Sequence, residues 1–315
     1  MNIGFYGKGG SGKTTISSLF ALYLDSKDHH VGLLDADVNS HTSDVIGIKS
    51  DLSKTLSTSK NEIDIWNYLA GKNLKVDPKE FLNTTPPGNG SGYWSMNKNN
   101  HLTKAYGQAF GVNAHLFTVG SYTEESIGVA CHHTTQSIAE NMVSHFMPEK
   151  EDVLVVDSVA GNDAFGTTLF LNDILVFVVK PEREGISVMN RFLQLSKSAG
   201  IEDKVLILGN QVGSDVQRHF LQREIPEEKL LGLLSVNNIV IDTRLEGKPL
   251  SIECLDSKAE AVFSKVYETA KSQKDHVSRY TRLLELHRKV AAEDWVSGSY
   301  RAGLVDQIDT AFSPS

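Results

Sequence analysis

The sequence predicts an α/β fold built on a mostly parallel, doubly wound sheet with helices on both faces. Short apolar runs recur along the chain, and longer segments with helical spacing of apolar residues separate them. Several of the runs lack the polar alternation of a half-exposed strand, which is typical of strands buried on both faces. We therefore expect about seven or eight strands, with a ligand site at their carboxyl ends.

The predicted elements follow from these runs in chain order. The predicted strands lie at residues 2–6, 31–35, 116–120, 153–157, 174–180, 205–210 and 230–234. The helical spacing appears at residues 15–26, 134–146 and 185–198. Residues 84–101 are rich in proline, glycine and asparagine, so we expect a flexible insertion there, either disordered or a lid.

The domain prediction separates an α/β domain at residues 1–257 from a C-terminal part at residues 258–315. The C-terminal part is expected to be a helical extension to about residue 295, followed by a loosely structured tail. Basic side chains gather in the extension, and a solvated helix face or a partner-docking helix would explain them. They are Lys271, Lys274, Arg279, Arg282, Arg288 and Lys289.

The composition limits the function classes. The chain has 315 residues, is 40% hydrophobic and 22% charged, and carries a formal net charge of −8, so nucleic acid is disfavoured as its partner. Its two cysteines, Cys131 and Cys254, form no disulfide framework and fit a reducing compartment. The first residues look like a strand rather than a signal peptide, and no apolar run approaches the ~18 residues of a membrane span. A cytoplasmic protein with no transmembrane segment is expected.

The strongest motif follows the first predicted strand and opens the first predicted helix. Residues 7–14, GKGGSGKT, satisfy the G-x-x-x-x-G-K-[ST] pattern of a phosphate-binding loop. Glycines let backbone N–H groups point at phosphates, and the helix N-terminus adds partial positive charge. Lys13 should reach the β- and γ-phosphates, and the Thr14 hydroxyl should bind Mg²⁺. The expected nucleotide-binding residues of this loop are Gly7, Lys8, Gly9, Gly10, Ser11, Gly12, Lys13, Thr14 and Thr15.

The loop contains an additional lysine, Lys8. With it, KGGSGKTT resembles the deviant Walker A motif of the MinD/ParA-type ATPases, P-loop NTPases of the SIMIBI class. The resemblance implies an ATP-dependent homodimer in which Lys8 crosses to the phosphates of the other subunit. A second cation there would neutralise the charge that moves to the leaving oxygen. The alternative is an ordinary solvated loop lysine.

Two aspartates end the second predicted strand in LLDAD, which resembles switch I of the same family. The resemblance implies that Asp37 orients or activates the attacking water and that Asp35 supports the Mg²⁺ shell. Most relatives have proline after the second aspartate, where this chain has Val38. A helix cap is the alternative role for such a carboxylate. Lys8, Lys13 and Asp37 are thus the expected catalytic residues.

Later strands supply the remaining nucleotide contacts. Asp157 ends VLVVD, a Walker B pattern, and should hold Mg²⁺ through water. The following DSVAG resembles switch II, in which Gly161 can donate its N–H to the γ-phosphate. Asn210 stands where the family's asparagine bonds adenine. Guanine-specific relatives bind the base with an aspartate at the position of Gly213, and this chain lacks that aspartate, so ATP is favoured over GTP.

A possible metal site precedes the Walker B strand in GVACHH, residues 128–133. This region reads G-C-x-C in the nickel-insertion ATPases of carbon monoxide dehydrogenase, and the nitrogenase iron protein has a cluster-ligating cysteine in a comparable place. Val129 replaces the first cysteine and Cys131 matches the second. Two Cys131 with two His132 or His133 across a dimer would give an S₂N₂ set suited to Zn²⁺ or another borderline metal such as Ni²⁺. The alternative is a small buried cysteine with solvated histidines; Cys254 is expected to be packing.

The resemblance leaves two function classes. The first is a dimerising ATPase with weak intrinsic hydrolysis that matures or loads a client metalloenzyme. The second is a positioning or partition ATPase that acts through DNA, a membrane or a scaffold protein. The acidic ending DQIDTAFSPS differs from a basic amphipathic membrane anchor, and only residues 271–289 offer a basic surface. A monomeric small-molecule kinase, a third class, would leave Lys8 without a role.

Overall fold

The protein folds around one eight-stranded sheet, which confirms the predicted fold class. The computed structural model describes residues 1–37, 41–120, 132–150, 152–161, 165–301 and 303–314. The strand order is β3-β4-β2-β5-β1-β6-β7-β8, and the described pairs are parallel except β3 with β4. The strands are β1 (Asn2–Gly7), β2 (His30–Asp35), β3 (Gln108–Ala109), β4 (Ala114–Thr118), β5 (Asp152–Asp157), β6 (Ile174–Val179), β7 (Val205–Val212) and β8 (Leu230–Ser235).

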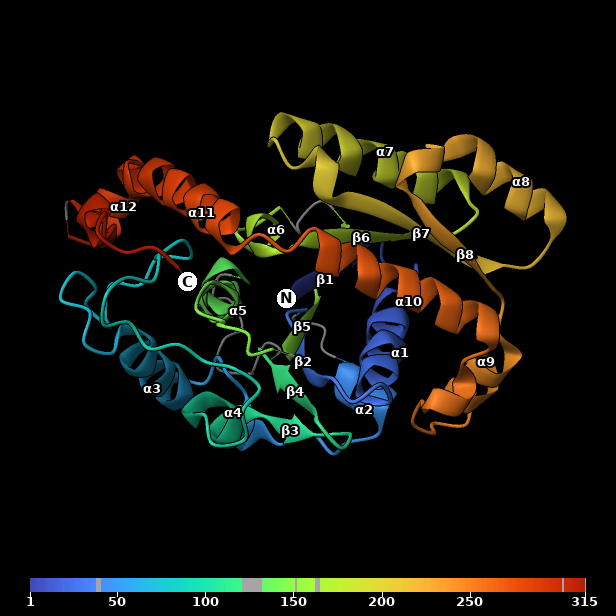
Figure 1. Ribbon diagram of the computed structural model, residues 1–315, viewed down its shortest axis with the longest axis horizontal. Coiled ribbons are helices and arrows are strands. Elements are labelled where there is room, and N and C mark those ends of the chain that lie inside the picture. The colour runs from blue at the N-terminus through green and yellow to red at the C-terminus, as the bar shows by residue number, and fades with distance from the viewer. Residues whose placement is uncertain (38–40, 121–131, 151, 162–164, 302, 315) are drawn as a thin grey trace.

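Helices cover both faces of this sheet (Figure 1). On one face, α1 (Lys13–Asp25), α2 (Thr42–Ile46) and α10 (Ser257–Ser272) enclose a core that includes Phe5 and Phe20. On the other face lie α3 (Ser59–Ala70), α4 (His101–Tyr106), α5 (His132–Ser144) and α7 (Arg183–Ser198). The remaining helices are α6 (Thr168–Leu171), α8 (Asp215–Glu224), α9 (Asn238–Leu245), α11 (His276–Ala291) and α12 (Asp294–Ser299).

Burial on both faces explains the continuous apolar runs of the strands. In β1, Ile3 and Phe5 belong to the core under α1, whereas Tyr6 belongs to the core under α7, and all three are fully buried. Successive strand residues point to opposite faces, so a strand with helices on both sides needs apolar residues at every position. Among the described residues, no helix combines the length and apolarity that crossing a membrane requires.

Residues 84–101 are packed into the protein, and this corrects the flexible insertion that their composition predicts. Trp94 is fully buried, and its indole N–H donates to the carbonyl of Met142 at 2.6 Å. Its ring also contacts Phe117 and Phe146 at centroid distances of 5.0 and 4.9 Å. A large buried aromatic side chain with its polar group satisfied anchors the segment, and the glycines and prolines shape the path between such anchors.

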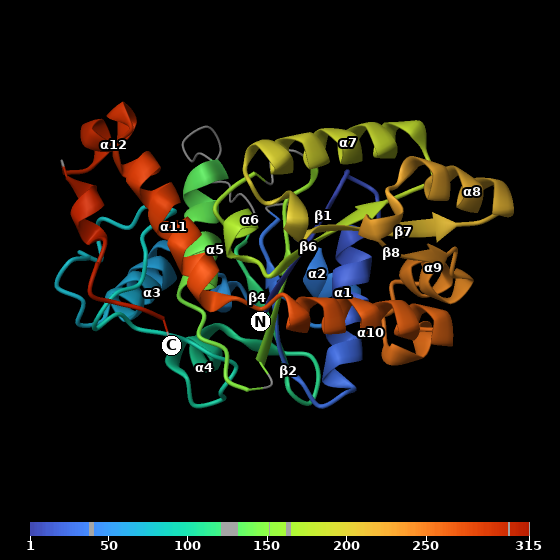
Figure 2. The same cartoon turned by 45° about the horizontal axis from the view of Figure 1, so that its top comes forward.

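The C-terminal part is also more ordered than predicted. The helical extension is divided into α10 and α11, and Asp275 caps α11 by accepting the backbone N–H of Ser278. The tail is not loose, since Leu304 and Gln307 are fully buried. The Gln307 side chain accepts a hydrogen bond from Thr85, 222 residues earlier in the chain, at 3.0 Å. The insertion and the tail therefore stabilise each other on one side of the sheet (Figure 2).

Candidate functional site

The phosphate-binding loop joins β1 to α1 at the carboxyl edge of the sheet. The backbone φ angles of Gly10 and Gly12 are 79° and 88°, in the left-handed region that glycine adopts without strain. A Cβ atom at Gly12 would collide with the side-chain amide of Asn210. Gly12 is also the N-cap residue of α1, so the loop delivers the helix N-terminus to the site. The observed backbone thus requires glycine at the positions of Gly10 and Gly12.

Lys13 and Asp157 form a buried ion pair at the centre of the site. The distance from Lys13 Nζ to Asp157 Oδ1 is 2.5 Å, and the side chains are 6% and 0% exposed. The second carboxylate oxygen of Asp157, Oδ2, is buried without a hydrogen-bond partner in the part of the chain that the structure describes. An unpartnered carboxylate oxygen beside a phosphate-binding loop suits Mg²⁺, which prefers oxygen ligands and retains several waters. The donor set therefore fits this cation.

The two aspartates predicted for switch I lie beside this pair. Asp35 is the register partner of Asp157 in the pairing of β2 with β5, and it is fully buried. The backbone N–H of Asp37 donates to Asp35 Oδ1 at 3.3 Å. Parallel strands end at the same edge of a sheet, so the fold places Asp35 next to Asp157. Residues 38–40, including Val38, lie outside the described residues.

Lys8 is paired within its own chain. Its ammonium lies 3.2 Å from Glu182 Oε1, and the two side chains are 37% and 38% exposed. Glu182 is the N-cap residue of α7, directly after β6, the neighbour of β1 in the sheet. The sequence analysis did not identify Glu182 as a partner of Lys8 within the same chain. The two residues are 174 positions apart, so no local sequence pattern could have predicted their contact.

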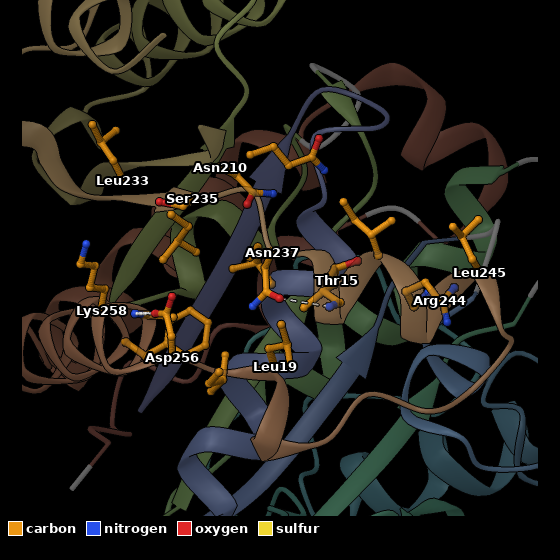
Figure 3. Close-up of a pocket in the computed structure, with 18 residues that line it drawn as sticks. Thr15, Leu19, Asn210, Leu233, Ser235, Asn237, Arg244, Leu245, Asp256 and Lys258 are labelled. Carbon is orange, nitrogen blue, oxygen red and sulfur yellow. Dashed lines mark hydrogen bonds between the residues drawn. The ribbon is translucent and has the colours of Figure 1, made fainter. Parts of the chain in front are cut away.

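A cavity of about 360 Å³ opens beside the phosphate-binding loop (Figure 3). Leu19 and Phe263 form part of its apolar wall, and Asn210, Ser235 and Asn237 supply polar groups around it. The Asn210 amide donates to the carbonyl of Ser11 at 2.9 Å, which ties the end of β7 to the loop. Apolar walls with a few polar groups suit a flat heterocyclic base.

Sequence reasoning identified Asn210 in this cavity but missed Ser235, Asn237 and Arg244. Ser235 and Asn237 follow the last predicted strand. Because ligands bind at the carboxyl ends of parallel strands, this position could have indicated that they line a binding site. Asn237 is placed by two contacts, because its amide donates to the carbonyl of Cys254 at 2.7 Å and its side-chain oxygen caps α9. Arg244 lies on α9, which has no buried residue.

Glu140 is a further buried carboxylate that the sequence did not indicate as functional. It lies on α5 and accepts the backbone N–H of Thr167 at 2.7 Å, just after the predicted switch II segment. Burial raises the pKa of Glu140 to about 7. Gly161 has a φ of 72°, and residues 162–164 lie outside the description. Glu140 therefore links α5 to the chain that follows Asp157.

Glu140→Gln is expected to stabilise the protein at pH 8 and to change little at pH 5. The pKa of this carboxyl is higher in the folded than in the unfolded chain, so its contribution is full below about pH 4.5 and is lost as pH rises through about 7. Glutamine stays neutral, so its advantage at pH 8 should be on the order of 3 kcal/mol at most. Urea unfolding at both pH values measures this, with the exposed Glu228→Gln as control. An equal effect at both pH values would contradict the assigned burial cost.

The predicted metal ligands are not placed by the structure. Cys131 lies outside the described residues, and of His132 and His133 only the backbone, the first turn of α5, is described. Within the described ranges, no three histidine, cysteine, aspartate or glutamate side chains are grouped so as to hold a metal ion. Cys254 is buried in the core under α1, which confirms its packing role.

Comparisons with known proteins agree with this geometry. The model of the CobQ/CobB/MinD/ParA nucleotide-binding domain matches residues 5–291. An uncharacterised ATP-binding protein of Methanocaldococcus jannaschii is 25% identical over 274 residues, which cover 85% of this chain and 96% of that protein. The carbon monoxide dehydrogenase accessory protein CooC of Rhodospirillum rubrum is 23% identical over 284 residues, covering 85% of this chain and 97% of CooC.

Solved structures show the same fold at lower identity. The cell division protein MinD of Aquifex aeolicus is 18% identical with a TM-score of 0.52, and the match covers 85% of this chain and 95% of MinD. A plasmid partition protein of Borrelia burgdorferi, bound to AMPPNP, is 13% identical with a TM-score of 0.55, covering 87% and 99%. With the phosphate-binding loop, the paired lysine and aspartate and the neighbouring cavity in place, the chain belongs to the CobQ/CobB/MinD/ParA family of nucleotide-binding proteins, as a MinD/ParA-type member related to CooC.

Proposed function

We propose that the protein is a slow, Mg²⁺-dependent ATPase that dimerises with ATP in the cytoplasm and helps to load a metal into a client metalloenzyme. The observation that carries the ATPase part is the buried pair of Lys13 with Asp157 at the N-terminus of α1. A cation and a buried carboxylate at a helix N-terminus suit a triphosphate and its metal ion. This cluster supports ATP hydrolysis more directly than any other feature of the chain.

The proposed cycle begins with nucleotide entry. The adenine lies in the cavity beside Asn210, and the phosphates bind to the loop, where Lys13 exchanges Asp157 for phosphate oxygens. Asp157, released from this pair, is then available to Mg²⁺ through water, together with Asp35 and the Thr14 hydroxyl. Asp37 orients the attacking water. MinD of Pyrococcus horikoshii, 17% identical with a TM-score of 0.50, is known as a complex with Mg-ADP, which supports this choice of cation.

Dimerisation is proposed from Lys8. Within one chain the Lys8 ammonium contacts Glu182, so it is not used to bind the phosphates of its own subunit. In the proposed dimer Lys8 leaves Glu182 and reaches the phosphates of the partner subunit. Hydrolysis would then depend on dimer formation, because the second cation arrives only with the partner.

Glu182→Gln is expected to strengthen ATP-dependent dimerisation by up to about fivefold. The neutral side chain no longer holds Lys8 in its own subunit, and a half-exposed ion pair contributes no more than about 1 kcal/mol. Sedimentation velocity with ATP and Mg²⁺ measures the dimer fraction, and Glu184→Gln, in the first turn of α7, serves as control. Weaker dimerisation in Glu182→Gln would mean that Glu182 acts across the dimer instead.

The metal-loading role is proposed from Cys131 and the two histidines that follow it. Cys131, with His132 or His133, would contribute to a site shared by two subunits, with Zn²⁺ or Ni²⁺ as the cargo. Support comes from the similarity to CooC, whose name describes an accessory protein of carbon monoxide dehydrogenase. His132 and His133 begin α5, and Glu140 of the same helix accepts the backbone N–H of Thr167 in the chain that follows Asp157.

Elemental analysis of the ATP-trapped dimer tests this role. The dimer of Asp37→Ala is isolated with ATP and compared with the same dimer carrying Cys131→Ser, and Cys254→Ala provides the matched cysteine control. About one metal equivalent per dimer, lost only with Cys131→Ser, would support metal loading. A dimer without metal would reject that role, and DNA retention with its salt dependence would then test the partition class.

A further inference from the structure

We propose that a cavity between the α/β domain and the C-terminal helices binds a segment of a partner protein that presents an apolar side chain next to a lysine or arginine. The cavity measures about 1110 Å³ and lies between α3, α5 and the pair α11–α12, on the side opposite α9 (Figure 1). Sites for small ligands usually measure about 300–1,000 Å³. The size therefore favours a peptide segment. From the proposed function, this inference takes two ideas: that the ATPase acts on a partner protein, and that the chain after Asp157 responds to the γ-phosphate.

Large apolar side chains line the cavity from both of its sides. Trp66 and Phe81 are stacked at a centroid distance of 4.6 Å on the α3 side, and Phe165 also lines the cavity. Trp295 of α12 faces this wall from the C-terminal helices and is 52% exposed, although it is a large apolar side chain. Aromatic side chains that remain accessible at a cavity rim are typical anchors of protein interfaces.

The charge of the lining selects the occupant. Among the described residues that line the cavity, three are carboxylates, Glu62, Asp77 and Glu140, and one is a cation, Lys79. The ion pairs of the described residues include none of the three carboxylates. Burial also raises the pKa of Glu62, as expected for a carboxylate that lacks a cationic neighbour. A lysine or arginine from a partner would supply the missing positive charge.

The cavity is connected to the nucleotide site through α5. Glu140 and Gly166 line this cavity and also a smaller one that contains Ala36 and Ser158. Ala36 and Ser158 directly follow the two aspartates that end β2 and β5. Glu140 accepts a hydrogen bond from the backbone N–H of Thr167, the residue after Gly166. An occupant that contacts Glu140 thus touches the chain that responds to the γ-phosphate, so its binding should depend on the nucleotide.

Peptide selection tests the proposal without knowledge of the natural partner. A display library of random short peptides is selected at pH 8 on the full-length Asp37→Ala protein with ATP and Mg²⁺. Parallel selections use the same protein carrying Glu62→Gln or Trp295→Ala, which change one charge and one accessible side chain. We expect enriched sequences with an apolar residue near a lysine or arginine. Labelled copies of these peptides should bind both cavity variants about tenfold more weakly.

Matched controls make the outcome specific. Glu228→Gln and Val277→Ala change an exposed carboxylate and an exposed apolar residue outside the cavity and should leave peptide binding unchanged. Replacing the peptide's basic residue by glutamate should abolish binding to the unaltered cavity. Equal binding by the cavity variants, enrichment of acidic sequences, or no cavity-dependent enrichment would overturn the proposal. A metal-free dimer would reject metal loading but leave this result standing, since peptide binding requires no metal.

Discussion

Asp37→Ala should lower ATP hydrolysis by at least about a hundredfold and leave ATP-dependent dimerisation intact. Asp37 is predicted to orient the attacking water, whereas the binding of the phosphates depends on the loop and on Lys13. The Asp37 backbone already bonds Asp35 at 3.3 Å, which places the residue beside the metal-binding edge. Removal of the side chain should therefore stop the chemical step after the dimer has closed.

Phosphate release and sedimentation in the presence of ATP measure the two effects separately. Asp44→Ala provides the control, because Asp44 is an exposed aspartate of the nearby α2. A variant that stays monomeric with ATP would show that Asp37 acts in binding or dimer closure. Hydrolysis at the unaltered rate would remove Asp37 from the catalytic residues.

Lys13→Ala should abolish hydrolysis and also destabilise the nucleotide-free protein. The substitution leaves the Asp157 carboxylate buried without its cation, because Asp157 is fully buried and its ion pair with Lys13 measures 2.5 Å. The loss of one partner of a buried pair usually costs about 3–5 kcal/mol of unfolding free energy. The same lysine is required at the phosphates, so hydrolysis should fall by at least about a hundredfold.

A second substitution separates the two effects of Lys13→Ala. Adding Asp157→Asn removes the uncompensated charge and should restore most of the stability, while hydrolysis stays absent because neither the lysine nor the carboxylate is present. Urea unfolding without nucleotide and phosphate release with ATP measure the two properties. Lys27→Ala is the control, since its pair with Glu260 at 3.4 Å is exposed. Unchanged stability in Lys13→Ala would contradict the importance of the buried pair.

The predictability of the strands follows from their burial. Every predicted strand is present, and the bounds differ by only a few residues, because two-sided burial produces an apolar run that is visible without knowledge of the fold. β3 was missed, since it is a two-residue edge strand, Gln108–Ala109, with no apolar run. Its pairing with β4 depends on a neighbouring strand rather than on its own sequence.

The segments that the sequence described incorrectly share one property. Residues 84–101 and the tail have compositions typical of loops, and much of their backbone is irregular. Their side chains, however, form hydrogen bonds with residues that are distant in the sequence. Asp309 accepts from the backbone N–H of Asn89, 220 residues away, at 2.9 Å. His287 lies 3.0 Å from Thr84 across 203 residues. Composition predicts the backbone irregularity of such segments and contains no information about these contacts.

The sequence by itself determined the phosphate-binding loop, the order of strands and helices and the carboxylates at the strand ends, because each depends on residues that are neighbours in the chain. Only the tertiary structure decided which groups meet: Lys8 with Glu182, Lys13 with Asp157, and Glu140 with the backbone of Thr167. It also decided the two cavities, whose walls come from segments far apart in sequence. The physical reason is that burial and long-range pairing depend on packing, and local sequence patterns record only which face of an element is apolar.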